Sequence, residues 1–147
     1  LKLRVRRLRG QEFMNLQKLI NKEMERNSEK YILTEGMEWE ELGGGVSRKF
    51  LGYDNQIMMV QVKFEKGALG SPHQHFHTQA TYCVSGKFEF EIDGVKQIVK
   101  GGDGVYIEPN LLHSAVCLEA GILIDTFSPV REDFLSGGGV SYFGDKD

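Results

Sequence analysis

The chain has 147 residues, of which 40% are hydrophobic and 27% charged, so its length and composition are those of one globular domain. Its net charge of −3 is too small to indicate a nucleic acid or a membrane surface as a partner, and no apolar run approaches the roughly 18 residues of a membrane-spanning helix. Cys83 and Cys117 give no disulfide framework, so we expect a reducing, cytoplasmic location.

The first residues, "LKLRVRRLRG", are basic, and no apolar segment follows them, which argues against a secretory signal. The chain begins at Leu1, and Met14 would serve as a natural start. We therefore interpret residues 1–12 as a basic N-terminal arm or as a remnant of cloning. The few basic residues give little support to a nucleic-acid-binding arm.

A helix is predicted over the next segment. From residue 12 to residue 27 apolar side chains recur every three or four positions, at Phe13, Leu16, Ile20 and Met24. This spacing places them on one face of an amphipathic helix. We expect the helical extension, residues 13–36, to dock on the main domain or on a neighbouring subunit.

Short apolar and β-branched segments follow the glycine-rich stretch "ELGGGVSRK". They are "IMMVQVKF", "FEFEI", "VKQIV", "VYIE", "HSAVCLE" and "GILIDTF", and the turn-forming stretches "GGDG", "PNLL" and "EAG" separate the later ones. Many short strands at this spacing, in a chain with 18 glycines, predict an all-β sandwich or barrel.

The segment "FEFEI-DG-VKQIV" predicts a β-hairpin, because an Asp-Gly pair favours a tight two-residue turn. A two-residue loop also fixes the register of the two strands. It pairs apolar residues with apolar ones and an acid with a base, at Ile92 with Val95, Phe88 with Val99 and Glu91 with Lys96.

Three of the four histidines, His73, His75 and His77, fall at alternate positions, with Gln79 in the same phase. Alternation on a strand would place these side chains on one face. Such histidines can simply line a polar face, but an H-x-H pair also brings two imidazoles close enough to share a metal ion. His113, after the turn-like "EPNLL", offers a third.

Three neutral imidazoles and an amide oxygen suit one divalent transition metal, Zn, Ni, Fe or Mn. We therefore predict a metal site made of His73, His75, Gln79 and His113. Because the glutamine is uncharged, the site would keep both positive charges of the ion and favour anionic ligands. His77 is surplus to four ligands, and it either supports the site or has an exposed structural role.

The histidine segment, "GALGSPHQHFHTQATYCVSG", resembles the first motif of the cupin superfamily, and "GDGVYIEPNLLH" resembles the second. The resemblance implies a single-domain cupin, a double-stranded β-helix or jelly-roll barrel, after a short N-terminal helix. Gln79 stands where cupins usually have glutamate. Glu108 and Asn110 replace the usual proline and glycine of the turn, and asparagine still adopts the left-handed conformation needed there.

Asp125 interrupts the apolar strand "GILIDTF", where an unpaired carboxylate would be costly. Phe127 shares its phase, and Arg131 follows. An acid, an aromatic ring and a guanidinium near a metal would suit proton transfer on a small anionic substrate. The structural alternative is a carboxylate that bonds a backbone group or pairs with Arg131.

The run from Trp39 to Gly70, with "VSGKFEFEIDG" and "REDFL", is similar to the pectin-degradation cupins that linearise 4,5-unsaturated uronates. The similarity covers residues 37–135 and leaves 136–147 as a C-terminal tail. It implies His73, His75, Gln79 and His113 as metal ligands and Asp125, Phe127 and Arg131 as catalytic residues. Gln74, Phe76 and Thr78 depart from the smaller, proline or acidic residues expected in the metal segment, and they bear on substrate identity.

The function implied by this resemblance is ring opening of an unsaturated uronate from pectin or alginate to a linear 4-deoxy-5-keto uronate. Arg131, Arg48 and Tyr106 would bind this small anionic sugar, although Arg48 and Tyr106 also suit surface pairing and core packing. Two other classes remain open: another metallocupin enzyme, either a dioxygenase or a sugar isomerase, and a non-catalytic sugar-binding cupin. By resemblance, we expect a homodimer.

Overall fold

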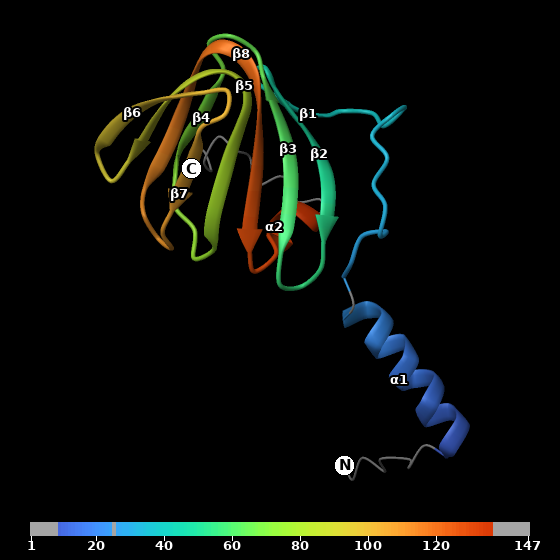
Figure 1. The fold of residues 1–147 in the computed structure, drawn as a ribbon. Coiled ribbons are helices and arrows are strands. Elements are labelled where there is room, and N and C mark those ends of the chain that lie inside the picture. Colours follow the sequence, from blue (N-terminus) through green and yellow to red (C-terminus); the bar gives the residue numbers. More distant parts are fainter. Residues whose placement is uncertain (1–8, 25, 137–147) are drawn as a thin grey trace.

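One curled eight-stranded sheet makes up most of the protein (Figure 1). The computed structural model describes residues 9–24 and 26–136. Along the sheet the order is β1-β2-β3-β8-β5-β6, with β4 also paired to β8 and β7 to β5. The strands are β1 (Glu40–Gly43), β2 (Val46–Tyr53), β3 (Met58–Phe64), β4 (Leu69–His73), β5 (Thr78–Ile92), β6 (Val95–Lys100), β7 (Gly104–Ile107) and β8 (His113–Ser128). The predicted all-β class is confirmed.

The two longest strands, β5 and β8, pair with each other along most of their length. The sequence predicts two strands separated by "EAG" where the structure has the single strand β8, so that prediction is wrong. The strands instead bend together where Gly86 and Gly121 meet. A Cβ atom on Gly121 would lie 2.1 Å from the Ser85 carbonyl oxygen, so only glycine permits this close approach.

The hairpin between β5 and β6 has the predicted register at all three predicted pairs. Asp93 and Gly94 form its turn with positive φ angles of 48° and 79°, as a tight primed turn requires. Lys96 forms its ion pair diagonally with Glu89, at 3.3 Å, and not with the directly opposite Glu91.

The core lies on the inner face of the curled sheet, where alternate residues of the strands point inward. Phe64 and Phe88 pack edge to face there, with ring centroids 5.4 Å apart. Each fully buried side chain of this size stabilises the fold by about 1.5–3 kcal/mol. Toward one end the same inner face carries polar side chains, which form the candidate site described below.

The predicted N-terminal helix is present as α1 (Gly10–Met24), and a second, short helix α2 (Glu132–Leu135) follows β8. Figure 1 shows α1 extending away from the sheet. Its apolar residues are exposed, Phe13 at 56% and Leu16 at 43%. The helix therefore does not dock on the main domain within the described residues, and docking on a neighbouring subunit stays a prediction. No helix in this part of the chain is long and apolar enough to cross a membrane.

Three other features of the sequence fall outside the described residues: most of the basic arm, the side chain of Met24, and residues 137–147 of the predicted tail. The predicted boundaries at residues 12, 36 and 135 stay predictions.

Candidate metal centre

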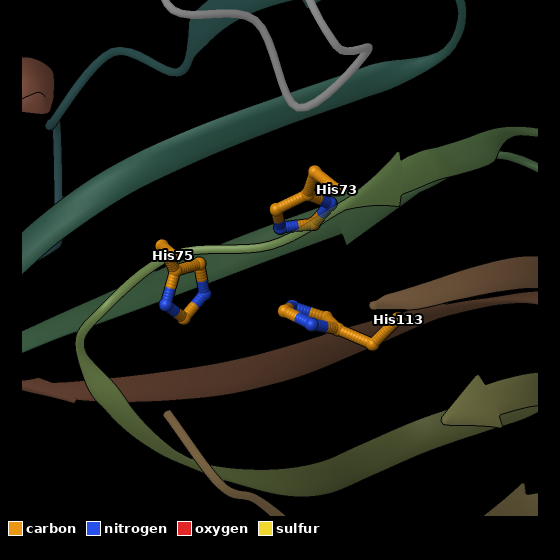
Figure 2. A group of neighbouring side chains, drawn as sticks. All are labelled: His73, His75 and His113. Carbon is orange, nitrogen blue, oxygen red and sulfur yellow. The ribbon is translucent and has the colours of Figure 1, made fainter. Parts of the chain in front are cut away.

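Three histidines converge at one end of the barrel interior (Figure 2). His73 ends β4, His113 begins β8, and the register of these strands places the two residues opposite each other. His75 comes from the connection between β4 and β5. One ring nitrogen of each histidine lies within 4.8 Å of those of the other two, a spacing that one metal ion can bridge.

The histidines do not lie on one strand, as their alternation predicts. Strand β4 ends at His73, and residues 74–77 form a connection to β5. The sequence pattern is misleading because the chain turns there: β4 pairs with the first residues of β8, and β5 begins opposite the last residue of β8. The backbone N–H of Asn110 donates to the His75 carbonyl oxygen at 2.8 Å and supports this connection. Asn110 has the predicted left-handed conformation, with φ of 65°.

Backbone carbonyls orient all three rings in the same way. The Nδ1 atoms of His73, His75 and His113 lie 2.8, 3.1 and 2.8 Å from the carbonyl oxygens of Ser71, His77 and Leu111, respectively. A carbonyl only accepts, so each Nδ1 carries the proton of a neutral ring. Each Nε2 is then a free lone pair, which is the arrangement that metal-ligating histidines need.

The surroundings of these Nε2 atoms fit a bound cation. The Nε2 atom of His113 is buried without a hydrogen-bond partner among the described residues. The Nε2 atom of His75 lies 3.0 Å from the Oε1 atom of Gln79, so two acceptors face each other. A metal ion would satisfy all of these lone pairs, which makes His73, His75, Gln79 and His113 a fitting ligand set.

Burial also keeps the rings neutral. It lowers the pKa of both His75 and His113 to about 4, and it lowers the pKa of His73 in the same direction. At neutral pH the three nitrogens are therefore ready to bind a metal without first losing a proton.

A buried chain of hydrogen bonds links the predicted ligand Gln79 to Asp125. The Gln79 Nε2 atom donates to the Thr81 hydroxyl at 3.0 Å, and this hydroxyl donates to Asp125 Oδ1 at 2.6 Å. Burial raises the pKa of Asp125 to about 6, although the hydrogen bond from Thr81 and the charge of Arg131 oppose the rise. A direct pair between Asp125 and Arg131, one of the two structural alternatives, is not formed within the described residues.

Arg131 is held by Asp133 instead. Its Nε and Nη2 atoms donate to the two carboxylate oxygens at 2.9 and 2.7 Å. Although burial raises the pKa of Asp133, these bonds and the charge of Arg131 hold it below its usual value. The guanidinium also lies over two aromatic rings, 5.2 Å from the Phe127 centroid and 4.2 Å from that of Phe134.

Two cavities are lined by residues of this site. An inner one of about 30 Å³, lined by His73, His113, Gln79, Asp125 and Phe127, holds no more than about one water molecule. An outer one of about 460 Å³, lined by residues that include His75, His77 and Arg131, has the size of a small-molecule pocket. The structure thus gathers Asp125 and Phe127 with three of the four predicted ligands and places Arg131 in the outer pocket, beside His75.

His77 lies beside the predicted ligands and is not one of the three clustered histidines. Its ring is buried and stacked on Phe76, with centroids 4.0 Å apart, and its Nε2 atom lies 3.2 Å from the Val130 carbonyl oxygen. Its own backbone carbonyl accepts from His75. Of the two predicted roles, this placement favours the one that supports the site, because the side chain is not exposed.

Arg48 and Tyr106 line neither of these two cavities. Arg48 is buried, pairs with Glu40 at 2.9 Å and lies over the rings of Phe50 and Phe134. Tyr106 is largely exposed on β7. Their predicted role in substrate binding stays a prediction.

Two residues of the site escape the sequence analysis. Thr81 follows Gln79 in the same strand phase, which is a signal for it, but its contact with Asp125 depends on the pairing of β5 with β8. Asp133 lies two residues after Arg131. This spacing does not by itself distinguish an acid that pairs with the arginine from an acid that is exposed to solvent.

The combination of barrel and histidine cluster defines the class of protein. A family model of the Cupin domain matches residues 60–124, a stretch that contains all four predicted ligands. The protein is a cupin, as its two motifs predict. The pectin degradation protein KdgF of Dickeya dadantii (strain 3937) is 47% identical over 108 residues, which are 72% of this chain and 98% of that protein. The chain therefore belongs to the family of pectin-degradation cupins.

Two solved structures support this family assignment. An RmlC-like cupin from Shewanella frigidimarina NCIMB 400 superposes with a TM-score of 0.73 at 45% identity, over 74% of this chain and 98% of that one. KdgF from Halomonas sp. gives a TM-score of 0.70 at 37% identity, over 73% and 99% of the respective chains.

Proposed function

We propose that the protein is a metal-dependent enzyme that opens the ring of a 4,5-unsaturated uronate and releases a linear 4-deoxy-5-keto uronate. The observation that carries this proposal is the buried chain from the histidine cluster through Gln79 and Thr81 to Asp125. It joins the candidate cation site to a carboxyl group that can hold or release a proton near neutral pH. Membership in the pectin-degradation family supplies the class of substrate.

The bound metal, one divalent Zn, Ni, Fe or Mn ion, would supply Lewis acidity toward an oxygen of the sugar. Its ligands would be His73, His75, Gln79 and His113. The outer pocket would admit the sugar, since its volume suits a small molecule. Arg131 would bind the substrate carboxylate there. Asp133 occupies Nε and Nη2, which leaves Nη1 as the nitrogen that this ion pair does not use.

Asp125 would move the protons of the reaction. Ring opening adds a proton at C4 and removes one from the C1 hydroxyl, while the C1–O5 bond breaks to leave a ketone at C5 and an aldehyde at C1. Substrate and product are isomers, so one carboxyl group can serve both steps. A pKa raised to about 6 suits this role, because general acid–base groups work best near the pH of the reaction. Phe127 would pack against the sugar.

The predicted homodimer and cytoplasmic location belong to this proposal. The exposed apolar face of α1 and the two free cysteines support them, respectively.

The test is incubation of metal-loaded protein with unsaturated uronates made by a polysaccharide lyase. We expect faster loss of the ultraviolet absorbance of the conjugated double bond and a linear keto product by NMR. Sugar recovered unchanged but bound would indicate a sugar-binding cupin. Dioxygen consumption that requires iron would indicate a dioxygenase. Either result would overturn the proposal.

A further inference from the structure

Three side chains that point into the barrel form one hydrogen-bonded series. Gln79 and Thr81 lie two residues apart on β5, and Asp125 is the direct cross-strand partner of Thr81 on β8. All three are nearly inaccessible, with exposed fractions of 6%, 3% and 5%. Buried polar groups of this kind must satisfy one another, so the direction of each hydrogen bond matters.

The Thr81 hydroxyl has a single hydrogen, and it donates this hydrogen to Asp125 Oδ1 at 2.6 Å. Toward Gln79 the hydroxyl oxygen can then only accept. The side-chain amide of glutamine has one donating and one accepting end, and the donating Nε2 end faces Thr81 at 3.0 Å. The accepting Oε1 end is thereby turned toward the Nε2 atom of His75.

We propose that Thr81 is a positioning residue that selects the orientation of the Gln79 amide and presents its oxygen to the metal. This inference rests on the proposed function of the histidine cluster. It also gives a reason for glutamine at position 79: an ionised glutamate there would place an oxygen against the Thr81 oxygen with no hydrogen between them. Without the hydroxyl, the donating end of the amide would lose its nearest acceptor, and the longer contact with Asp125 would remain to hold it.

The test uses Co²⁺ as the probe, because its visible absorption depends on the number and type of its ligands. Three variants are compared with the wild-type protein. Thr81→Val removes the hydroxyl but keeps the shape, Thr81→Ser keeps the hydroxyl, and Thr126→Val is a matched control on β8 next to Asp125. Thr81→Ala carries the test if Thr81→Val does not fold. Co²⁺ affinity and spectrum are measured first, then kcat and KM on the unsaturated uronate.

We expect Thr81→Val to change the Co²⁺ spectrum and to weaken Co²⁺ binding about tenfold, as loss of a residue that orients a ligand commonly does. In the metal-saturated variant kcat should fall with little change in KM. Thr81→Ser and Thr126→Val should resemble the wild-type protein. Wild-type behaviour of Thr81→Ser would show that the hydroxyl group alone orients the Gln79 amide.

An unchanged spectrum and affinity in folded Thr81→Val or Thr81→Ala would overturn the role of Thr81, even if the wild-type protein linearises the uronate. An inactive wild-type protein with the expected Co²⁺ behaviour would overturn the proposed reaction and leave Thr81 as a positioning residue. A wild-type protein that binds no Co²⁺ would overturn both.

Discussion

Arg131 and Asp133 form a two-pronged ion pair, with the Nε and Nη2 atoms of the arginine on the two carboxylate oxygens. The pair lies at the outer pocket rather than beside Asp125. A substrate carboxylate therefore cannot take the Nε–Nη2 edge of Arg131 while Asp133 holds it. Arg131 and Asp125 thus have different surroundings, and their substitution should have different kinetic effects.

Arg131→Ala should chiefly raise KM. A hydrogen bond to a charged group contributes about 1.5–3 kcal/mol, which corresponds to roughly a tenfold to hundredfold loss of substrate affinity. Arg131→Lys is the matched control, because it keeps the charge and loses the planar guanidinium, so its KM should fall between the two. Steady-state kinetics on metal-saturated protein measure both. An unchanged KM in Arg131→Ala would exclude contact with the substrate.

Asp125→Asn should lower kcat by about 10²–10⁴ if Asp125 transfers the protons. Asparagine can still accept from Thr81, so the metal content and the melting temperature should stay close to those of the wild-type protein. Both are measured on the samples used for the kinetics. Full turnover in a stable Asp125→Asn protein would contradict the catalytic role.

His75→Ala and His113→Ala should each lose most of the bound metal, because the remaining ligands no longer enclose the ion. His77→Ala should keep it, since the His77 Nε2 atom faces the Val130 carbonyl oxygen and the ring only packs edge to face on His75, with centroids 5.3 Å apart. Metal content per chain, measured by elemental analysis, separates these outcomes. Equal retention in all three variants would mean that the ion binds elsewhere.

Acid should displace the metal only well below neutral pH. Burial lowers the pKa of His75 and His113 from 6.5 to about 4, so protons compete for their nitrogens only as the pH approaches that value. We expect Zn²⁺ affinity, measured by calorimetric titration, to change little between about pH 7 and 5.5 and to fall steeply only as the pH approaches about 4. A steep loss already between pH 7 and 6 would contradict these lowered pKa values.

The same shifts fix the pH dependence of stability in the metal-free protein. Between pH 6.5 and about 4 the unfolded state binds more protons at His75 and His113 than the folded state does, so these residues lower the free energy of unfolding as the pH falls. Asp125 acts in the opposite direction. Its pKa rises from 3.8 to about 6, so its contribution is largest at low pH and is lost as the pH rises through about 6. Asp125→Asn should therefore make the acid-induced loss of stability steeper, as urea unfolding would show.

Local patterns predicted much of this structure. The Asp93–Gly94 turn fixed the hairpin register, because a two-residue loop allows few alternatives. The ligand types at His73, His75 and His113 predicted a cluster that the structure assembles, although two of the three come from a strand end and a connection.

Most of the predictions that failed, and most of the contacts that were missed, depend on relations between residues far apart in the sequence. The continuity of β8 through "EAG" depends on Gly121 meeting Gly86, which no local pattern encodes. Thr81 is an ordinary strand residue until the register places it opposite Asp125, 44 positions away. The pairing of Arg131 with Asp133 instead of Asp125 depends on how the chain turns into α2 after β8.

The bend at Gly121 limits the insertions and deletions that strand β8 can accept. His113 lies before this bend in β8, whereas Asp125 and Phe127 lie after it, and all three line the inner cavity. Side chains alternate between the two faces of a strand, so one residue inserted at the bend would reverse the phase of everything that follows. His113 would still face inward, but Asp125 and Phe127 would turn to the outer surface. His113 therefore faces the same cavity as Asp125 and Phe127 only while the number of residues between them stays odd or changes by an even number.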